Sequence, residues 1–112
     1  MNPQNPGMQK SQPTENLTMR EIEKLARALP DPYSIIIFET FEGSGCWTAE
    51  IFFIGKEIRH YGLETGRGVV KIWKTLFGAL DFVTEFCPGA MEVKFTFRGC
   101  NFIYSKTVCE GE

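Results

Sequence analysis

The sequence predicts an α+β domain in which two helices cover one face of an antiparallel sheet of four to five strands, in the order α-β-β-(β)-α-β-β. Two segments have the apolar periodicity of helices. Two pairs of runs rich in β-branched and aromatic residues are separated by short turns that contain glycine. A helix followed by a hairpin, occurring twice, is typical of α+β proteins rather than of repeated βαβ units.

The N-terminal segment differs in composition from the rest of the chain. Residues 1–16 are rich in Asn, Gln and Pro, and Met is their one type of large apolar residue. Such a segment buries too little apolar surface to offset the entropy lost on ordering. We therefore expect a flexible polar tail over residues 1–16 and a single α+β domain over residues 17–112.

Two helices are expected. The first begins after Thr18, because Thr18 and Glu21 have the spacing of a capping box, and it ends before Pro30. The second is expected from about Gly68 to Phe86. Its predicted apolar stripe consists of Val69, Ile72, Trp73, Leu76, Leu80 and Val83.

The pattern predicts four strands in two hairpins and a further strand between them. The first hairpin joins residues 34–42 to residues 46–54 across a Gly-Ser-Gly turn. A further strand over residues 57–63 follows the Gly55-Lys56 turn. The last hairpin joins residues 91–98 to residues 100–108, and Met91, Val93, Phe95 and Phe97 are expected to face inward.

The net charge and the distribution of apolar residues argue against several classes of protein. The net charge of −2 argues against a general nucleic-acid-binding protein, which needs excess Lys and Arg to neutralise phosphates. The start of the chain lacks the apolar run of a secretory signal, and no segment is apolar for long enough to cross a bilayer. We therefore expect a cytoplasmic protein with reduced thiols and no membrane partner.

No catalytic, metal or cofactor site is indicated. The four cysteines form no CxxC pair, and the chain has a single histidine, His60, so zinc-ligand spacing is absent. We interpret His60 as a surface or hydrogen-bonded structural residue, with a general base as the weaker alternative. Glu39 and Glu50 are expected on adjacent strands as solvated carboxylates, although such a pair is able in principle to perform acid–base chemistry.

Charge is distributed unevenly along the chain. The segment from residue 31 to residue 54 contains four acids and no base, and the segment 56–74 contains five bases and two acids. Such polarity suits recognition of a charged protein partner. The partner-binding acids are expected to be Asp31, Glu39, Glu42 and Glu50. The alternative is a weak nucleic-acid or phosphate-anion site formed by Arg59, Arg67, Lys71 and Lys74.

The glycines before the second helix raise the same alternative. Gly62, Gly66 and Gly68 precede an expected helix N-terminus, where unpaired amides attract anions. Their spacing matches neither GxGxxG nor the GK[ST] ending of a triphosphate loop. We therefore expect mainly a structural turn, with Arg67 as the weak anion contact.

Ten phenylalanines in 112 residues exceed what a small core needs. On the projection of a helix from Gly68, Phe82 and Phe86 point away from the apolar stripe and share their side with Gly78. Either the first helix or the tail covers them, or another chain does. Phe52 and Phe38 are expected on the less apolar face of the sheet and extend the argument.

These observations lead to a functional hypothesis without a family. The α-β-β-β-α order resembles the double-stranded RNA-binding domain, but the helix expected to begin at Gly68 carries only Lys71 and Lys74 where that family has a lysine-rich start. We assign no family. The sequence favours a small non-catalytic protein-binding or regulatory domain, inhibitory in one version, that forms a homodimer or binds another protein through aromatic and charged residues.

Overall fold

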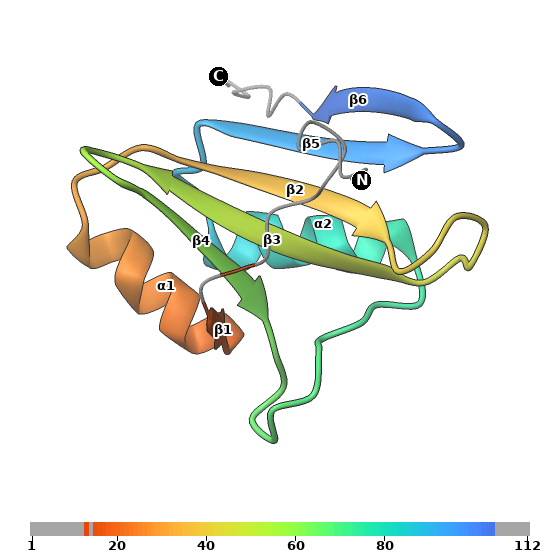
Figure 1. Cartoon of the computed structure of the whole chain (residues 1–112), viewed down its shortest axis with the longest axis horizontal. Helices are drawn as coiled ribbons and strands as arrows, with labels where there is room; N and C mark the ends of the chain where they lie inside the picture. The colour runs from red at the N-terminus through yellow and green to blue at the C-terminus, as the bar shows by residue number, and fades with distance from the viewer. Residues whose placement is uncertain (1–12, 14, 105–112) are drawn as a thin grey trace, which may run out of the picture.

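The computed structural model describes Pro13 and residues 15–104 and shows an α+β arrangement of two helices and one six-stranded sheet (Figure 1). Most of the tail expected over residues 1–16 therefore lies outside the described residues. The elements are β1 (Glu15–Leu17), α1 (Met19–Ala28), β2 (Tyr33–Glu39), β3 (Trp47–Ile54), β4 (Ile58–Leu63), α2 (Leu76–Phe86), β5 (Glu92–Phe97) and β6 (Cys100–Tyr104).

The sheet is mixed, so the prediction of a purely antiparallel sheet is wrong. Its strand order is β1-β4-β3-β2-β5-β6. The two predicted hairpins are antiparallel, but β5 runs parallel to β2, and β1 runs parallel to β4. The chain returns through α2 to the far side of β2, which sets β5 in the same direction as β2. The β1 strand adds a sixth member, and its three residues include Glu15 and Asn16 from the expected tail.

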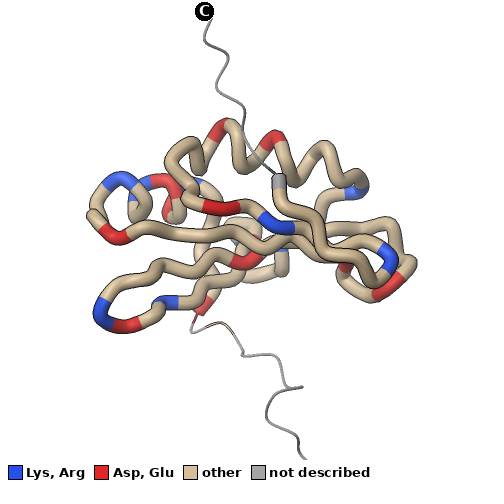
Figure 2. The backbone as a smooth tube through the Cα atoms, turned by 90° about the horizontal axis from the view of Figure 1, so that it is seen from above, with Lys and Arg blue, Asp and Glu red and all other residues tan. Residues whose placement is uncertain are grey.

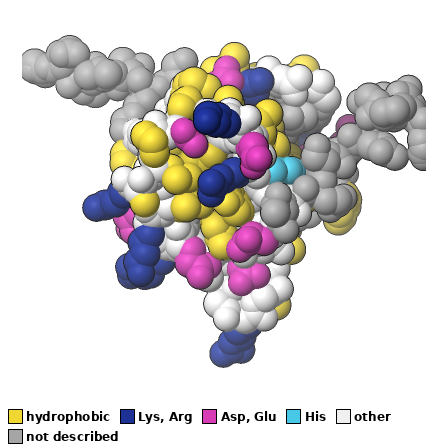
Figure 3. Space-filling view, turned by 60° about the vertical axis from the view of Figure 1, so that its left-hand side comes forward, with side chains coloured by type: hydrophobic (Ala, Val, Ile, Leu, Met, Phe, Trp, Pro, Cys, Tyr) yellow, Lys and Arg dark blue, Asp and Glu magenta, His cyan; other side chains and the backbone are white. Residues whose placement is uncertain are grey.

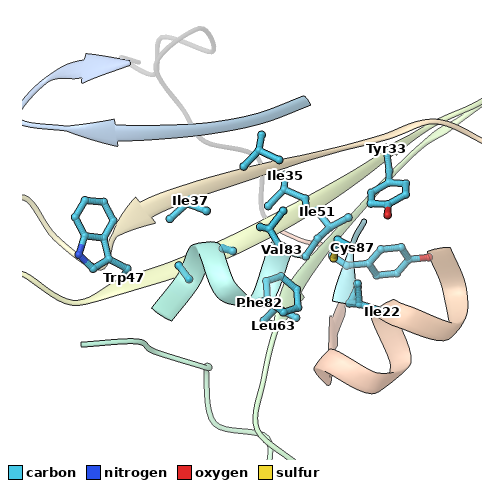
Figure 4. Packing of buried hydrophobic residues seen from close by; sticks show 14 of the residues in the cluster. Ile22, Tyr33, Ile35, Ile37, Trp47, Ile51, Leu63, Phe82, Val83 and Cys87 are labelled. Atoms are coloured by element: carbon cyan, nitrogen blue, oxygen red, sulfur yellow. The ribbon is translucent and has the colours of Figure 1, made fainter. Parts of the chain in front are cut away.

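Both helices lie on one face of the sheet, as predicted, and the core fills the space between them and the strands (Figures 1 and 4). Alternate residues of the central strands point toward the helices because side chains alternate along a strand. The fully buried members of this core with the largest side chains are Phe53, Ile22, Ile35, Ile37, Ile51, Leu63 and Cys87.

The first helix has the predicted cap. The Glu21 amide donates to Thr18 Oγ1 at 3.2 Å, and the Thr18 amide donates to Glu21 Oε1 at 2.8 Å. These two bonds satisfy donors that the first turn of a helix leaves unpaired. The helix ends with Leu29 as its C-cap, directly before Pro30.

The second helix is shorter than predicted, because it begins at Leu76 and not near Gly68. The preceding segment contains Gly66, Gly68 and several β-branched residues, all of which are weak helix formers. This segment is instead extended, and Trp47 and Trp73 exchange both backbone hydrogen bonds at 2.7 Å. Thr75 then caps the helix by accepting a bond from the Gly78 amide at 3.0 Å.

The shift of the helix start removes the first two residues, Val69 and Ile72, from the predicted apolar stripe, whereas Trp73, Leu76, Leu80 and Val83 do pack in or against the core. Val69 and Ile72 belong to the extended segment and are exposed. The buried residues of α2 are Val83, as predicted, together with Ala79 and Phe82. The prediction that Phe82 points away from the core is therefore wrong, since only 3% of its surface is exposed.

Two ionisable groups lie inside the core. Burial, with a smaller contribution from Glu23, raises the pKa of the Cys87 thiol from 9.0 to about 12. Burial and then the neighbouring Cys87 raise the pKa of the Tyr33 hydroxyl. Cys87 is therefore a protonated thiol at neutral pH, which makes it a poor nucleophile. Neither helix of the described chain has the length and apolarity needed to span a bilayer.

Candidate functional site

One face of the sheet has no helix over it in the described part of the chain. We call it the helix-free face. The strand register places Ser34 opposite Glu92 and Phe52 opposite His60 on this face. Its further residues are Ile36 and Phe38 of β2, Glu50 and Ile54 of β3, Ile58 of β4, and Lys94 and Thr96 of β5, because each follows at an interval of two.

A hollow lies on the helix-free face, toward the end of the sheet where β3 turns into β4. Its lining is mainly apolar on β2, β3 and β4 and charged on β5: Ser34, Ile36, Phe52, Ile54, Ile58, Glu92 and Lys94. Ile58 is 66% exposed and Ile54 is 40% exposed. Figure 3 shows hydrophobic side chains gathered with Lys, Arg, Asp and Glu among them, and His60, the one histidine, near their margin. A concave apolar site with a few charged groups is the usual form of a binding site.

A polar pair borders this hollow. His60 Nε2 lies 2.7 Å from Glu50 Oε1, and the imidazole ring stacks on Phe52 with 4.0 Å between ring centroids. The His60 side chain is 8% exposed. The other ring nitrogen, Nδ1, is buried and has no hydrogen-bond partner among the described residues.

The arrangement around His60 supports a structural role more than a catalytic one. Phe52 covers one side of the ring, and Glu50 occupies Nε2. General base catalysis needs a ring nitrogen directed at a substrate or nucleophile. Within residues 15–104, no three His, Cys, Asp or Glu residues lie together in a way that would hold a metal ion.

The four predicted acids do not form one surface. Asp31 precedes the start of β2 beside Gly55, whereas Glu39 ends β2 at the opposite end of the sheet. Glu39 accepts bonds from the amides of Gly43 and Gly45 at 3.1 and 2.9 Å, which ties down the hairpin loop. Glu42 lies with Glu39 in a second hollow that also contains Arg98, and Glu50 is bonded to His60.

The predicted basic residues are also separated. Arg59 lies near the start of β4, and Arg67 lies in the turn beyond its end. Lys71 Nζ lies 5.6 Å from the centre of the Trp73 ring, which is a cation–π distance. Figure 2 shows acidic and basic positions side by side at both ends of the sheet, so charge polarity along the sequence does not become polarity in space.

The glycines of the basic segment make a turn, as expected. Gly68 has a φ of 78°, and its amide donates to the Thr65 carbonyl at 3.2 Å. The Thr65 amide in turn donates to the Val69 carbonyl at 2.7 Å. The helix N-terminus that was expected to follow directly lies farther along the chain, so this turn does not present helix amides to an anion at Arg67.

The three α2 residues expected at a partner surface face their own chain. Phe82 stacks on Phe86 at 5.7 Å and packs near Trp73 at 5.4 Å. Phe86 is half-buried against the core. A Cβ added at Gly78 would lie 3.0 Å from Trp73 Cδ1, so this glycine makes room for Trp73 and not for a second protein. The exposed phenylalanines of the described chain are Phe41, Phe77, Phe97 and Phe102.

The residues around the hollow were largely missed from the sequence, although a signal was present. The expected Gly55-Lys56 turn fixes the register of β3 against β4 once Ile54 is paired with Ile58. That register places Glu50 diagonally across from His60. The parallel pairing of β5 with β2, which brings in Glu92 and Lys94, had no local signal because it depends on the path through α2.

Comparisons with known proteins assign no family. No family model, no curated protein and no solved structure matches the chain. A function has to be argued from the geometry of the helix-free face.

Proposed function

We propose that this chain is a small non-catalytic protein-binding domain of regulatory type, and that its recognition surface is the helix-free face. The observation that supports the proposal is the mainly apolar hollow on this face, near the β3–β4 turn. Ile54 and Ile58 expose 40% and 66% of their surface there. Apolar side chains gathered in an exposed patch are stabilised when a partner removes them from water.

The chemistry of the hollow defines the partner. Ile36, Phe52, Ile54 and Ile58 suit one apolar anchor side chain, since hot spots of protein interfaces fill desolvated pockets. Glu92 and Lys94 line the same hollow and lie 3.8 Å apart, so charge of both signs is available at its edge. The expected partner is a protein segment with a large apolar residue flanked by polar or charged residues.

Such a domain regulates its partner simply by binding to it. A domain of this kind changes the activity of its partner by covering a surface or by holding it in place, and no covalent step is needed. The inhibitory version, in which Asp31, Glu39, Glu42 and Glu50 together mimic phosphates, is not supported by their positions. The expected cytoplasmic location stays a prediction from the sequence.

The proposal is tested with a peptide partner selected against the full chain from a displayed library. Its affinity is measured by fluorescence anisotropy for the wild type, for Ile58→Glu and for Val69→Glu. Both substitutions place a carboxylate at a similarly exposed position, since Val69 is 60% exposed, but only Ile58 lines the hollow. We expect Ile58→Glu to weaken binding at least about tenfold, or ~1.4 kcal/mol, and Val69→Glu to change it less than about twofold.

Two results would contradict the proposal. One is a set of selected peptides whose affinity is the same for both variants. The other is selection of strongly acidic peptides or nucleic acid whose binding falls steeply with salt and depends on Arg59, Arg67, Lys71 and Lys74. That second result would support the anion-binding alternative, for which the dispersed positions of these four residues offer no shared surface.

A further inference from the structure

Within residues 15–104 the sheet ends on one side at β6, and no strand of this range pairs with its outer edge. In the strand order β1-β4-β3-β2-β5-β6, no described strand follows β6. Arg98 and Gly99 have φ values of 53° and 78°, as in the two-residue turns that favour positive φ at both positions. The register then pairs Phe97 with Cys100, Phe95 with Phe102 and Thr96 with Asn101.

This register determines which backbone groups point outward. The pair that flanks a two-residue turn is hydrogen-bonded, and pairs alternate from there along an antiparallel ladder. Phe102 therefore bonds to Phe95 within the hairpin. Asn101 and Ile103 occupy the intervening pairs, so their N–H and C=O groups point away from β5. The Thr96 hydroxyl donates to Asn101 Oδ1 at 2.9 Å. Side chains of a non-hydrogen-bonded pair lie closer together than those of a hydrogen-bonded pair, so this contact agrees with the assignment.

The edge lacks the features that usually prevent strand pairing. Natural edge strands are blunted by Lys, Pro, a bulge or short length. The β6 sequence, CNFIY, contains no charge and no proline, and its register with β5 is continuous. Phe102 is 43% exposed and Ile103 is 61% exposed. The opposite edge differs, because β1 has only three residues.

We propose that two copies of this chain associate edge to edge through antiparallel pairing of their β6 strands, with the two-fold axis at Phe102. Asn101 of one copy then pairs with Ile103 of the other, and the outward groups of both residues form four backbone hydrogen bonds. Phe102 lies opposite its own symmetry mate in a non-hydrogen-bonded pair, where Cα atoms approach to about 4.5 Å. The stacked Phe95 and Phe102 rings, 5.0 Å apart, continue into those of the second copy.

The edge favours a second copy over an unrelated strand because it is self-complementary. In a two-fold symmetric interface the residue on the axis lies opposite its own copy. A charged residue there would therefore face a like charge. The uncharged β6 sequence avoids this repulsion. Two-fold pairing also keeps the helices of both copies on one side, so the two helix-free faces form one continuous surface. The dimer does not depend on the function proposed above, which concerns a different surface.

The first test is sedimentation equilibrium of the full chain over a range of concentrations. We expect a reversible dimer whose dissociation constant rises more than about tenfold in Ile103→Pro and less than about twofold in Ile103→Val. The Ile103 amide has no role in the β5–β6 ladder, so proline removes an outward donor without removing a hydrogen bond of the hairpin. A wild type that is monomeric throughout, or a dimer unaffected by Ile103→Pro, overturns the proposal.

A cross-linking test fixes the register and does not rely on the proline variant. Cysteine is placed at residue 102 or at residue 101 in a chain whose Cys46, Cys100 and Cys109 are changed to Ser. The proposed axis brings the two residues 102 within disulfide distance and offsets the two residues 101 along the strands. Phe102→Cys should form a covalent dimer on mild oxidation and Asn101→Cys should not. Equal cross-linking of the two, or cross-linking of Asn101→Cys alone, contradicts the register.

The two proposals fail separately. If Ile58→Glu abolishes peptide binding while the dimer persists, the helix-free face is functional and independent of β6. If Ile103→Pro gives a monomer that still binds the peptide with unchanged affinity per chain, the dimer is real and its loss removes only bivalent binding, the gain in avidity that linked sites provide. Loss of the dimer in Ile58→Glu as well would mean that the helix-free face, and not the β6 edge, forms the dimer.

Discussion

Glu50 and His60, ten residues apart in sequence, meet across the β3–β4 ladder with 2.7 Å between Oε1 and Nε2. Among the residues that the structure describes, neither side chain makes another hydrogen bond, and the His60 ring, stacked on Phe52, is almost fully enclosed. A buried polar group that loses its partner retains the full cost of leaving water. The pair therefore fixes β4 against β3 at the margin of the hollow.

Removing the Glu50 carboxylate should show how much the Glu50–His60 bond contributes to stability. We expect Glu50→Ala to lower the free energy of unfolding by about 1–3 kcal/mol, because His60 is left with two unpaired ring nitrogens. Urea denaturation measures the effect. Glu57→Ala is the matched control, since Glu57 is exposed in the turn of the same hairpin, and it should change stability by less than about 0.5 kcal/mol. Equal effects of the two variants would mean that the Glu50–His60 bond contributes nothing measurable.

The two phenylalanines Phe82 and Phe77 distinguish the observed position of α2 from the predicted one. Phe82 is 3% exposed and Phe77 is 77% exposed. We expect Phe82→Ala to destabilise the protein by about 3–5 kcal/mol and Phe77→Ala by less than about 1 kcal/mol. Thermal or urea unfolding checks both. The reverse order would restore the sequence-based placement of Phe82 off the core.

The start of α2 is tested through its cap. Thr75 accepts a bond from the Gly78 amide, so Thr75→Ala should cost about 0.5–2 kcal/mol. Thr84 lies in the interior of the same helix and its hydroxyl bonds to the Leu80 carbonyl at 3.2 Å. Alanine has the higher helix propensity, so Thr84→Ala should be neutral or slightly stabilising. Chemical denaturation of the two variants gives the comparison, and a neutral Thr75→Ala would argue for a helix that begins earlier.

The buried Cys87 thiol predicts a dependence of stability on pH. Above pH 9 the unfolded chain loses the Cys87 proton, while the native chain retains it because burial raises the pKa to about 12. The native state then binds more protons, so the free energy of unfolding falls as pH rises from 9 toward 12, by at most about 1.4 kcal/mol per pH unit. Below pH 9 this contribution is constant.

Cys87→Ala supplies the comparison for this effect. The variant is less stable at neutral pH because a buried side chain is truncated. Its deficit relative to the wild type should shrink as urea titrations move from about pH 8 to about pH 10.5, since only the wild type has the Cys87 proton to lose. A deficit that is the same at both pH values would mean that the native thiol ionises as readily as the unfolded one.

Local signals in the sequence predicted local structure well. The capping box at Thr18, the antiparallel β2–β3 and β5–β6 pairs and the strand at β4 all follow from residue types within a few positions of each other. Each depends on short-range hydrogen bonding or on the alternation of side chains. These are the interactions that a sequence pattern reports directly.

The errors arose where structure depends on distant parts of the chain. Apolar β-branched residues such as Val69 and Ile72 fit a helical stripe on paper, but Trp73 is held extended by backbone bonds to Trp47, more than twenty residues away. The start of α2 then moved, and the face assigned to Phe82 moved with it. The three residues of β1, Glu15, Asn16 and Leu17, are too few to show an alternating pattern, and only their pairing with β4 makes them a strand.

The candidate site could be predicted only in part. The sequence identified the less apolar sheet face, with Phe52 on it, as a place for contact, and it identified a surplus of aromatic residues. It did not bring Lys94 to Ile36 and Ile58, because Lys94 belongs to β5, whose place beside β2 is set by the crossover through α2. Runs of acidic residues in the sequence did not predict an acidic surface. The seven-residue strand β2, which ends at Glu39, places Asp31 and Glu39 at opposite ends of the sheet.

The most direct measurement of the central claim is the mapping of a selected peptide onto the full chain by NMR chemical-shift perturbation. The account predicts the largest shifts at Ile36, Phe52, Ile54, Ile58 and Lys94, with small shifts on the exposed residues of α1 and α2. Shifts concentrated on the helices or on the turn around Arg67, with the hollow unchanged, would contradict the assignment of the helix-free face as the binding surface.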